Sequence, residues 1–169
     1  MGPEELRAIQ APLKQKYRED ANAAMITLKA EGRLGDGITC KVESGKSMKE
    51  AGLHPATGGN GLFACSGDML LESLVACAGV TMNAVATSLG IEIREGIVKA
   101  EGDLDFRGTL GVAKEAAVGF RKIRLSFHLV TNATDEQLTP LLRLTERYCV
   151  VFQTLQNSPE LKITCHKEN

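Results

Sequence analysis

The chain has 169 residues, 43% of them hydrophobic and 24% charged, which fits a single folded domain. Its 20 Lys and Arg nearly balance its 21 Asp and Glu, so the charge gives no sign of binding to nucleic acid or to an anionic membrane. The first residues carry acids where a secretory signal would be basic and then apolar, so we expect a cytoplasmic protein. The five cysteines are odd in number and scattered, so we expect some free thiols.

The first part of the chain is expected to form a helix, a hairpin and a long loop. Apolar residues recur at helical spacing from Pro3 to Asp20, which predicts an amphipathic helix. Two β-prone runs, 25–30 and 38–42, predict a hairpin with residues 31–37 at its tip. Residues 44–67 are rich in Gly, Ser and Pro, so they predict a loop.

The most apolar segment runs from Asp68 to Leu89 and is helical by its pattern. Ser66 or Asp68 is the expected N-cap, and Gly90 is the expected C-terminal stop. The segment is about long enough to cross a bilayer, but its polar residues make a buried core helix the better interpretation.

The second half of the chain predicts a sheet and another long helix. Two alternating runs, 91–106 and 120–131, predict antiparallel strands, and 110–118 is a further candidate strand. A capping pattern predicts a helix over about 134–157, followed by a short last strand over 161–165. The fold class is therefore α+β with two long helices.

Each of the two long helices carries a cysteine. On an ideal helical wheel, Cys77 lies at the edge of an apolar arc, and Cys149 lies on an apolar stripe with Thr145. Free cysteines are more often small buried hydrophobes than reactive groups, and the pattern alone favours that interpretation. A reactive Cys77 would need a nearby positive charge, because it lies too far into its helix for the dipole to suffice. An arginine held by Asp68 or Glu72 would serve, but both acids lie on the far side of the wheel, so it would come from another element or subunit.

Two segments resemble the cysteine-bearing helices of the OsmC/Ohr family of thiol-dependent peroxidases. Residues 65–77 (CSGDMLLESLVAC) resemble the acid- and leucine-rich helix that ends in the family's reactive cysteine, and residues 144–155 (LTERYCVVFQTL) resemble the helix with the second cysteine. The order of expected elements from about residue 24 onward also agrees. Residues 1–23 would then be an N-terminal helical extension and residues 24–169 the OsmC/Ohr-like domain.

The resemblance implies an OsmC/Ohr-like fold, with antiparallel sheets packed around two long central helices in an intertwined homodimer whose active sites lie at the interface. It implies that the Cys77 thiolate cleaves the O–O bond of an organic hydroperoxide, which leaves a sulfenic acid and an alcohol. Cys149 then condenses with the sulfenic acid to a disulfide, which an external thiol or dithiol reduces. No flavin, haem or metal is required, and apolar walls would favour alkyl or lipid peroxides over hydrogen peroxide.

The resemblance also suggests the groups that activate Cys77, and here the chain departs from the family pattern. Arg33 follows a glycine, like the arginine of the Gly-Gly-Arg loop in the Ohr branch, and Asp68 is the matching carboxylate. The acid often lies ten residues before the reactive cysteine, where this chain has Gly67; the nine-residue spacing resembles a less characterised subgroup. Val150 stands where many relatives have proline after the second cysteine, so the helix geometry there could differ.

The sequence leaves alternatives to the peroxidase. The first is a noncatalytic protein that binds a small apolar ligand or senses redox state in an oxidative or osmotic stress response. The second is thiol-based acyl transfer or hydrolysis, which would need His54 or His128 as a base near Cys77. A metal site has little support, because no CxxC or HxxxH spacing occurs and the histidines are far apart.

Overall fold

The computed structural model describes residues 3–34, 40–43, 52–62 and 64–167, and within these the side chains of 8–27, 31, 52–62 and 64–167. The helices, 3-10 turns and strands follow the chain in this order: α1 (Pro3–Glu19), η1 (Ala21–Ala24), β1 (Met25–Leu34), β2 (Cys40–Glu43), η2 (Pro55–Thr57), α2 (Ser66–Leu89), β3 (Ile93–Asp105), α3 (Phe106–Thr109), β4 (Phe120–Thr131), α4 (Asp135–Tyr148) and α5 (Val150–Gln156).

The four strands form one antiparallel sheet in the order β2-β1-β3-β4. Side chains that alternate along β3 leave Val98, Ala100 and Leu104 buried on one face. Gly102 belongs to the same face, and a Cβ there would lie 2.4 Å from the ring of Phe120, so glycine lets β4 close over β3 at this point. The mixed α/β architecture with an antiparallel sheet agrees with the prediction.

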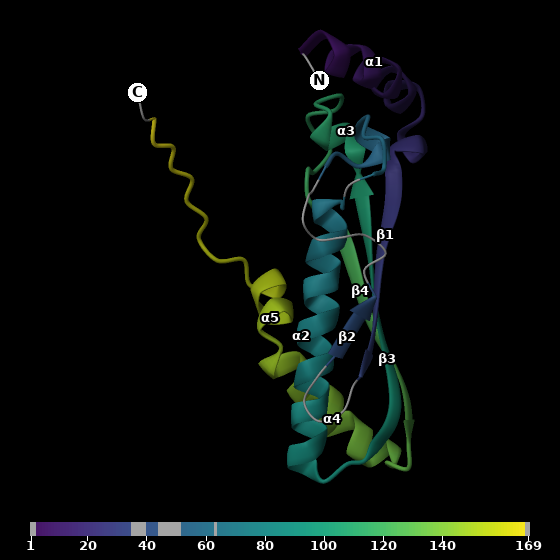
Figure 1. Cartoon of the computed structure of the whole chain (residues 1–169), viewed down its shortest axis with the longest axis vertical. Coiled ribbons are helices and arrows are strands. Elements are labelled where there is room, and N and C mark those ends of the chain that lie inside the picture. Colours follow the sequence, from purple (N-terminus) through teal and green to yellow (C-terminus); the bar gives the residue numbers. More distant parts are fainter. Residues whose placement is uncertain (1–2, 35–39, 44–51, 63, 168–169) are drawn as a thin grey trace.

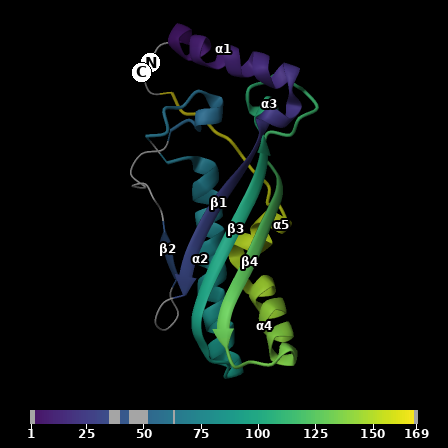
Figure 2. The same cartoon turned by 90° about the vertical axis from the view of Figure 1, so that its right-hand side faces the viewer.

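The long helix α2 lies along the buried face of the sheet, and α4 and α5 lie beside it (Figures 1 and 2). The buried residues of α2 recur at helical spacing. Four of them pack with the buried side of β3 in the main core: Leu71, Leu74, Val75 and Ala78. A second cluster around Met82 and Leu141 joins α2 to α4. α2 is long and apolar enough to cross a membrane, but half of its most apolar window is already buried within this chain, as in a core helix.

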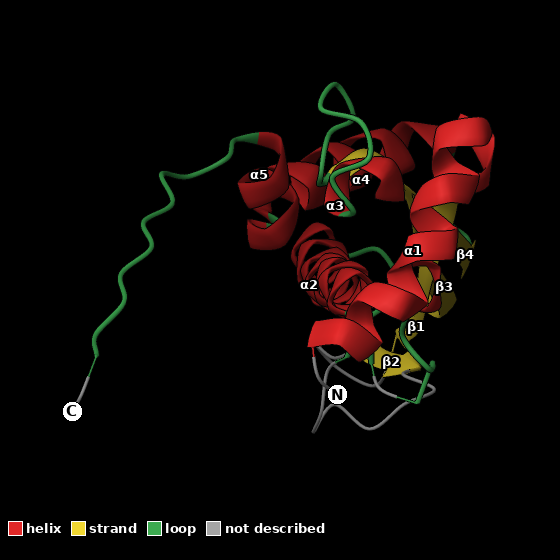
Figure 3. Ribbon diagram, turned by 90° about the horizontal axis from the view of Figure 1, so that it is seen from above, coloured by secondary structure: helices red, strands yellow, loops and turns green. Residues whose placement is uncertain are grey.

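One end of the molecule is covered by α1, η2 and α3 (Figures 1 and 3). Tyr17 of α1 is buried, and its hydroxyl donates a hydrogen bond of 2.6 Å to the Ala56 carbonyl oxygen. The ring of His54 stacks on that of Phe106 with 5.0 Å between centroids. These contacts attach the N-terminal helix to the segment that leads into α2, while the expected domain boundary after residue 23 stays a prediction.

Several predicted boundaries differ from the structure. Cys65 is the N-cap of α2 and makes no side-chain cap bond, so the expected cap at Ser66 or Asp68 is wrong, although Gly90 ends the helix with φ 67° as expected. β1 continues to Leu34, beyond the predicted strand, and residues 35–39 of the expected hairpin tip lie outside the described residues. Residues 110–118 form turns and bends instead of a strand.

The expected second long helix and last strand are also wrong for the single chain. The helix is interrupted at Cys149, which separates α4 from α5. Residues 161–165 have no strand partner, and the chain after α5 runs away from the body of the molecule (Figure 1). A strand needs a neighbouring strand for its backbone groups, and this segment has none within the described part of the chain.

Candidate active site

Cys77 lies near the middle of α2, at the border between the buried face and the exposed face of the helix. Its side chain is half-buried and packs against the main core. Residues at helical spacing from Cys77 along its solvent-facing side are exposed and form a stripe on α2: Leu70, Ser73, Val80 and Thr87. The thiol of Cys77 therefore lies between the core and an outer surface that mixes apolar and hydroxyl side chains, so its predicted position at the edge of the apolar arc is confirmed.

Cys149 lies where the second cysteine segment leaves helical geometry. Its N–H still donates to the carbonyl oxygen of Thr145, but its ψ of 105° is extended and a new helix begins at Val150. The side chain is only 1% exposed, and Thr145 is equally buried. The predicted inward direction of Cys149 is confirmed, while the interruption was not foreseen.

The fold brings the two thiols together. Burial raises the pKa of the Cys149 thiol to about 11, and its interaction with Cys77 adds to the increase. The two side chains also belong to the same core cluster. The thiols are therefore close enough to interact, and both are free cysteines, which makes them candidates for a disulfide.

The helix interruption also directs backbone groups at Cys149. The N–H groups of Val151 and Phe152 face its sulfur and lower its pKa by less than burial raises it. Neither N–H forms a regular cap hydrogen bond. Both groups would favour a thiolate at Cys149 once the proton has left.

An apolar cavity of about 180 Å³ adjoins the pair. Cys149 and Phe152 form part of its wall together with residues of α2, α4 and β4: Ala78, Leu125, Phe127, Leu142, Thr145 and Glu146. A second cavity of about 270 Å³ shares Leu125 and Phe152 with it and continues between β4 and α5. The surroundings of the pair can therefore accept an apolar group next to the sulfur of Cys149.

The predicted activating groups are not brought to Cys77 by the described residues. Asp68 lies in the first turn of α2, about 13 Å from Cys77 along the helix axis at 1.5 Å per residue. The backbone of Arg33 lies within β1, opposite Ile97 of β3 and Lys41 of β2, and its side chain lies outside the described residues. The roles of Arg33 and Asp68 stay predictions.

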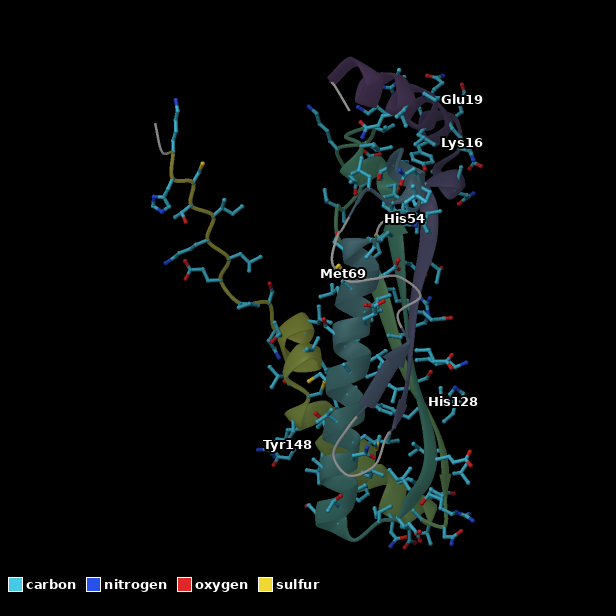
Figure 4. All side chains as sticks on the ribbon, viewed as in Figure 1. Lys16, Glu19, His54, Met69, His128 and Tyr148 are labelled. Atoms are coloured by element: carbon cyan, nitrogen blue, oxygen red, sulfur yellow. The ribbon has the colours of Figure 1, made fainter. Side chains whose placement is uncertain are left out.

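The two histidines considered as bases lie on other elements than α2, and far apart from each other (Figure 4). His54 stacks on Phe106 at the end covered by α1, and its Nδ1 accepts a hydrogen bond from the N–H of Ala56. His128 is exposed on β4, and strand alternation places it on the face opposite to the core residue Phe127. Acyl transfer with a histidine base therefore has no support at Cys77. Across the described residues, no group of three or more His, Cys, Asp or Glu side chains is arranged to hold a metal.

Comparison with known proteins places this arrangement in a family. The model of the family described as OsmC-like protein matches residues 59–164, well over half of the chain, and that span contains both Cys77 and Cys149. This chain belongs to the OsmC-like family. No curated protein matches it.

Two solved OsmC-like structures are similar to this one in fold. An OsmC-like hydroperoxide resistance protein from Jannaschia sp. CCS1 has a TM-score of 0.58 and 13% identity, over 82% of this chain and 91% of that chain. An OsmC-like protein from Mycoplasma pneumoniae has a TM-score of 0.50 and 18% identity, over 79% of this chain and 86% of that chain. At these identities the likeness establishes a shared OsmC-like fold alone.

Proposed function

We propose that this OsmC-like protein is a thiol-dependent peroxidase that reduces organic hydroperoxides to alcohols through Cys77 and Cys149. The observation that carries the proposal is that the two thiols, from different helices, meet in one core cluster and interact. Packing alone would be satisfied by any two small apolar residues, whereas a pair of neighbouring thiols can give up two electrons by forming a disulfide. The OsmC-like family and the hydroperoxide resistance neighbour agree with it.

The proposed reaction has two steps within the protein. The Cys77 thiolate attacks the terminal oxygen of ROOH, the O–O bond breaks, and the alkoxide takes a proton from solvent to leave as ROH. Cys149 then loses its proton and attacks the sulfur of the Cys77 sulfenic acid, and the hydroxide that leaves takes up a proton to become water. The dithiol has then become a disulfide, and an external thiol or dithiol restores it by exchange.

The cavities beside the pair support an organic substrate over hydrogen peroxide. The apolar wall of the cavity at Cys149 includes Leu125, Phe127, Leu142 and Phe152, and the neighbouring cavity, which includes Leu155, shares Leu125 and Phe152 with it. Burial of an alkyl group there would contribute about 0.8 kcal/mol for each methylene. Hydrogen peroxide has no group that gains this free energy.

A homodimer is part of the proposal. Leu70 and Val80 are 37% and 38% exposed on the stripe of α2 that borders Cys77, and we propose that a second copy of this chain covers them. The C-terminal tail supports the same occupant, because Leu161 and Ile163 are 82% and 98% exposed and alternate with polar residues as in a strand. The tail would add to a sheet edge of the partner.

Deletion of residues 158–169 would then convert a dimer to a monomer in analytical ultracentrifugation, and a full-length monomer would contradict the proposal.

Activation of Cys77 by Arg33 and Asp68, from this chain or from its partner, also belongs to the proposal. An arginine held by a carboxylate stays charged and would stabilise the Cys77 thiolate. We further propose a cytoplasmic protein without metal, flavin or haem, because reduced thiols persist in the cytoplasm. Arg33→Ala would then slow peroxide reduction by about 10-fold or more while Arg18→Ala, exposed in the last turn of α1, would not.

The activity is tested by consumption of cumene hydroperoxide by the fully reduced protein without added reductant. We expect one equivalent of peroxide to be consumed for each chain, and none by Cys77→Ser. Cys65→Ser is the matched control, because it removes a half-buried free thiol from the N-terminus of the same helix while leaving the pair intact. Equal consumption by Cys77→Ser and the unaltered chain would exclude this function.

A noncatalytic ligand-binding role has one observation in its favour. The larger cavity, about 340 Å³, lies at the start of α2 and not at the thiol pair, with walls that include Leu53, Leu70, Phe106 and Phe120. Its volume is in the range of small-molecule sites. Tight binding of an apolar ligand, unchanged in Cys77→Ala, together with no peroxide consumption would favour this role.

A further inference from the structure

The side chain of Thr145 makes an unusual hydrogen bond for a threonine in a helix. Four other hydroxyl side chains of α2 and α4 donate to the backbone carbonyl oxygen four residues earlier, at 2.8 to 3.0 Å: Ser73, Thr81, Thr87 and Thr139. Thr145 instead donates across the contact between α4 and α2, to Sδ of Met82 at 3.8 Å. Its hydroxyl is therefore directed towards α2 and not back to the backbone of α4.

This hydrogen bond contributes little to the stability of the fold. Thr145 is 1% exposed, so water does not reach its hydroxyl, and a thioether sulfur is a weak acceptor. Burial of a hydroxyl without a strong partner costs free energy. A valine would fill the same space without that cost. Packing alone therefore does not account for a threonine at this position.

Thr145 also supplies a buried hydroxyl to the wall of the 180 Å³ cavity. Cys149 lies one helical turn further along the same wall, and its N–H donates to the Thr145 carbonyl oxygen. Glu146 belongs to the wall as well, but it is exposed. The other described wall residues are apolar: Ala78, Leu125, Phe127, Leu142 and Phe152. A ligand in this cavity would meet apolar side chains and one buried hydroxyl close to the thiol of Cys149.

We propose that Thr145 binds the oxygen of the substrate and of the product. Its hydroxyl exchanges Sδ of Met82 for the hydroperoxide or alcohol group of a ligand whose alkyl part lies in the cavity. A hydroxyl can accept a hydrogen bond from such a group and donate one to its oxygen, which is a stronger acceptor than a thioether. The identity of the ligand rests on the proposed peroxidase function, which this inference deepens.

The exchange would make the cavity selective for oxygen-bearing ligands. A site with a buried hydrogen-bonding group disfavours an analogue that lacks the matching group. Here the preference is modest, because Met82 takes the hydrogen bond back when the ligand is a hydrocarbon. A protein cavity of about 150 Å³ holds benzene, so the volume at Thr145 suits a branched or aromatic group of similar size.

The test compares two ligands that differ by one oxygen atom. They are 2-phenyl-2-propanol, the alcohol that cumene hydroperoxide would yield, and cumene, the hydrocarbon with the same carbon skeleton. Affinities are measured by NMR titration of the reduced full-length chain, at the methyl groups of Ala78 and Leu142 in the cavity wall. Thr145→Val removes the hydroxyl and Thr145→Ser keeps it. Thr139→Val is the matched control at an exposed position of α4, and Glu146→Gln tests the other polar residue of the wall.

We expect Thr145→Val to weaken binding of the alcohol by about five- to tenfold, the loss of one hydrogen bond, and to leave cumene binding within about twofold. Thr145→Ser, Thr139→Val and Glu146→Gln should bind the alcohol within about threefold of the unaltered chain. Unchanged alcohol binding in Thr145→Val, equal weakening for both ligands, or no binding of the alcohol to the unaltered chain would overturn the inference.

Urea denaturation separates this role from a structural one. Thr145→Val should be at least as stable as the unaltered chain, because the weak bond to Met82 and the cost of burying the hydroxyl are lost together. A Thr145→Val chain that is markedly less stable, or that does not fold, would show that the hydroxyl serves the fold and would also overturn the inference. Because neither measurement uses a peroxide, the result is separate from the peroxide-consumption assay that decides the proposed function.

Discussion

The two ends of the first half of α2 each present a cysteine, and they differ in what surrounds it. Cys65 is the N-cap of the helix, beside the larger cavity. Cys77 lies deeper in the helix and is close enough to Cys149 to interact with it. No second cysteine lines the described wall of the cavity at Cys65. The comparison teaches that a disulfide needs a partner thiol, which the tertiary fold supplies to Cys77 and not to Cys65.

The largest expected effect is the choice of the oxidised residue. In Cys149→Ser, which cannot form the disulfide, one equivalent of cumene hydroperoxide should leave a sulfenic acid that dimedone labels at Cys77. We expect labelling of Cys77 over Cys65 by about 100-fold or more, a difference in activation free energy of about 2.7 kcal/mol. Comparable labelling of the two residues would show that the helix N-terminus matters more than the pair.

The next effect is on stability and concerns the packing that places Cys77. Leu74 is buried against the sheet one turn before Cys77, whereas Leu70 on the exposed stripe is 37% exposed. Leu74→Ala should lower the free energy of unfolding by about 2–5 kcal/mol in urea denaturation. Leu70→Ala should lower it by less than about 1 kcal/mol in the single chain. An equal or larger loss for Leu70 would place the main packing face of α2 elsewhere.

The pH dependence of stability separates Cys149 from the other thiols. Its pKa is raised from 9.0 to about 11 in the folded chain, so the folded state holds this proton more tightly than the unfolded state does. The resulting stability is fully present below pH 9 and is lost as the pH rises to about 11, on the order of 2 kcal/mol.

Burial of Tyr17 raises its pKa too and adds to the same alkaline loss, so a matched variant is needed. Cys149→Ser has no thiol to titrate, and its stability should fall less between pH 9 and 11 than that of the unaltered chain. Cys65→Ser should keep the full decrease. Identical slopes for the unaltered chain and Cys149→Ser would mean that the Cys149 thiol is not held protonated by the fold.

The smallest expected effect is at the end covered by α1. Tyr17→Phe removes the hydrogen bond to the Ala56 carbonyl oxygen and should lower the free energy of unfolding by about 1 kcal/mol. The rate of peroxide consumption should stay within about twofold, because the change lies at the far side of the segment that precedes α2. A large loss of rate with a small loss of stability would mean that α1 positions the thiol pair.

Residue pattern alone predicted the elements that follow a regular period. The apolar stripe of α2, its glycine stop at Gly90 and the alternation in β3 and β4 are local signals, and the structure confirms them. The edge position of Cys77 and the inward direction of Cys149 follow from the same periodicity. The family, and with it the pairing of the two cysteines, came from resemblance to known motifs.

Other features depend on contacts that no local pattern contains. No glycine or proline marks the interruption at Cys149, and the β-branched Val150 and Val151 after it are a faint signal at best. Asp68 and Arg33 were joined to Cys77 by analogy, but nine residues of helix separate Asp68 from it, and the side chain of Arg33 lies outside the described residues. The tail at Leu161 has the pattern of a strand, yet a pattern cannot say which chain offers the edge.

The most direct test of the account is the identity of the disulfide formed by one equivalent of cumene hydroperoxide. The reduced protein is oxidised, its remaining thiols are alkylated, and its peptides are analysed by mass spectrometry without reduction. The account predicts a single cross-link between Cys77 and Cys149, with Cys40, Cys65 and Cys165 recovered as alkylated thiols. A cross-link that involves Cys40, Cys65 or Cys165, or oxidation with both Cys77 and Cys149 still alkylated, would contradict it.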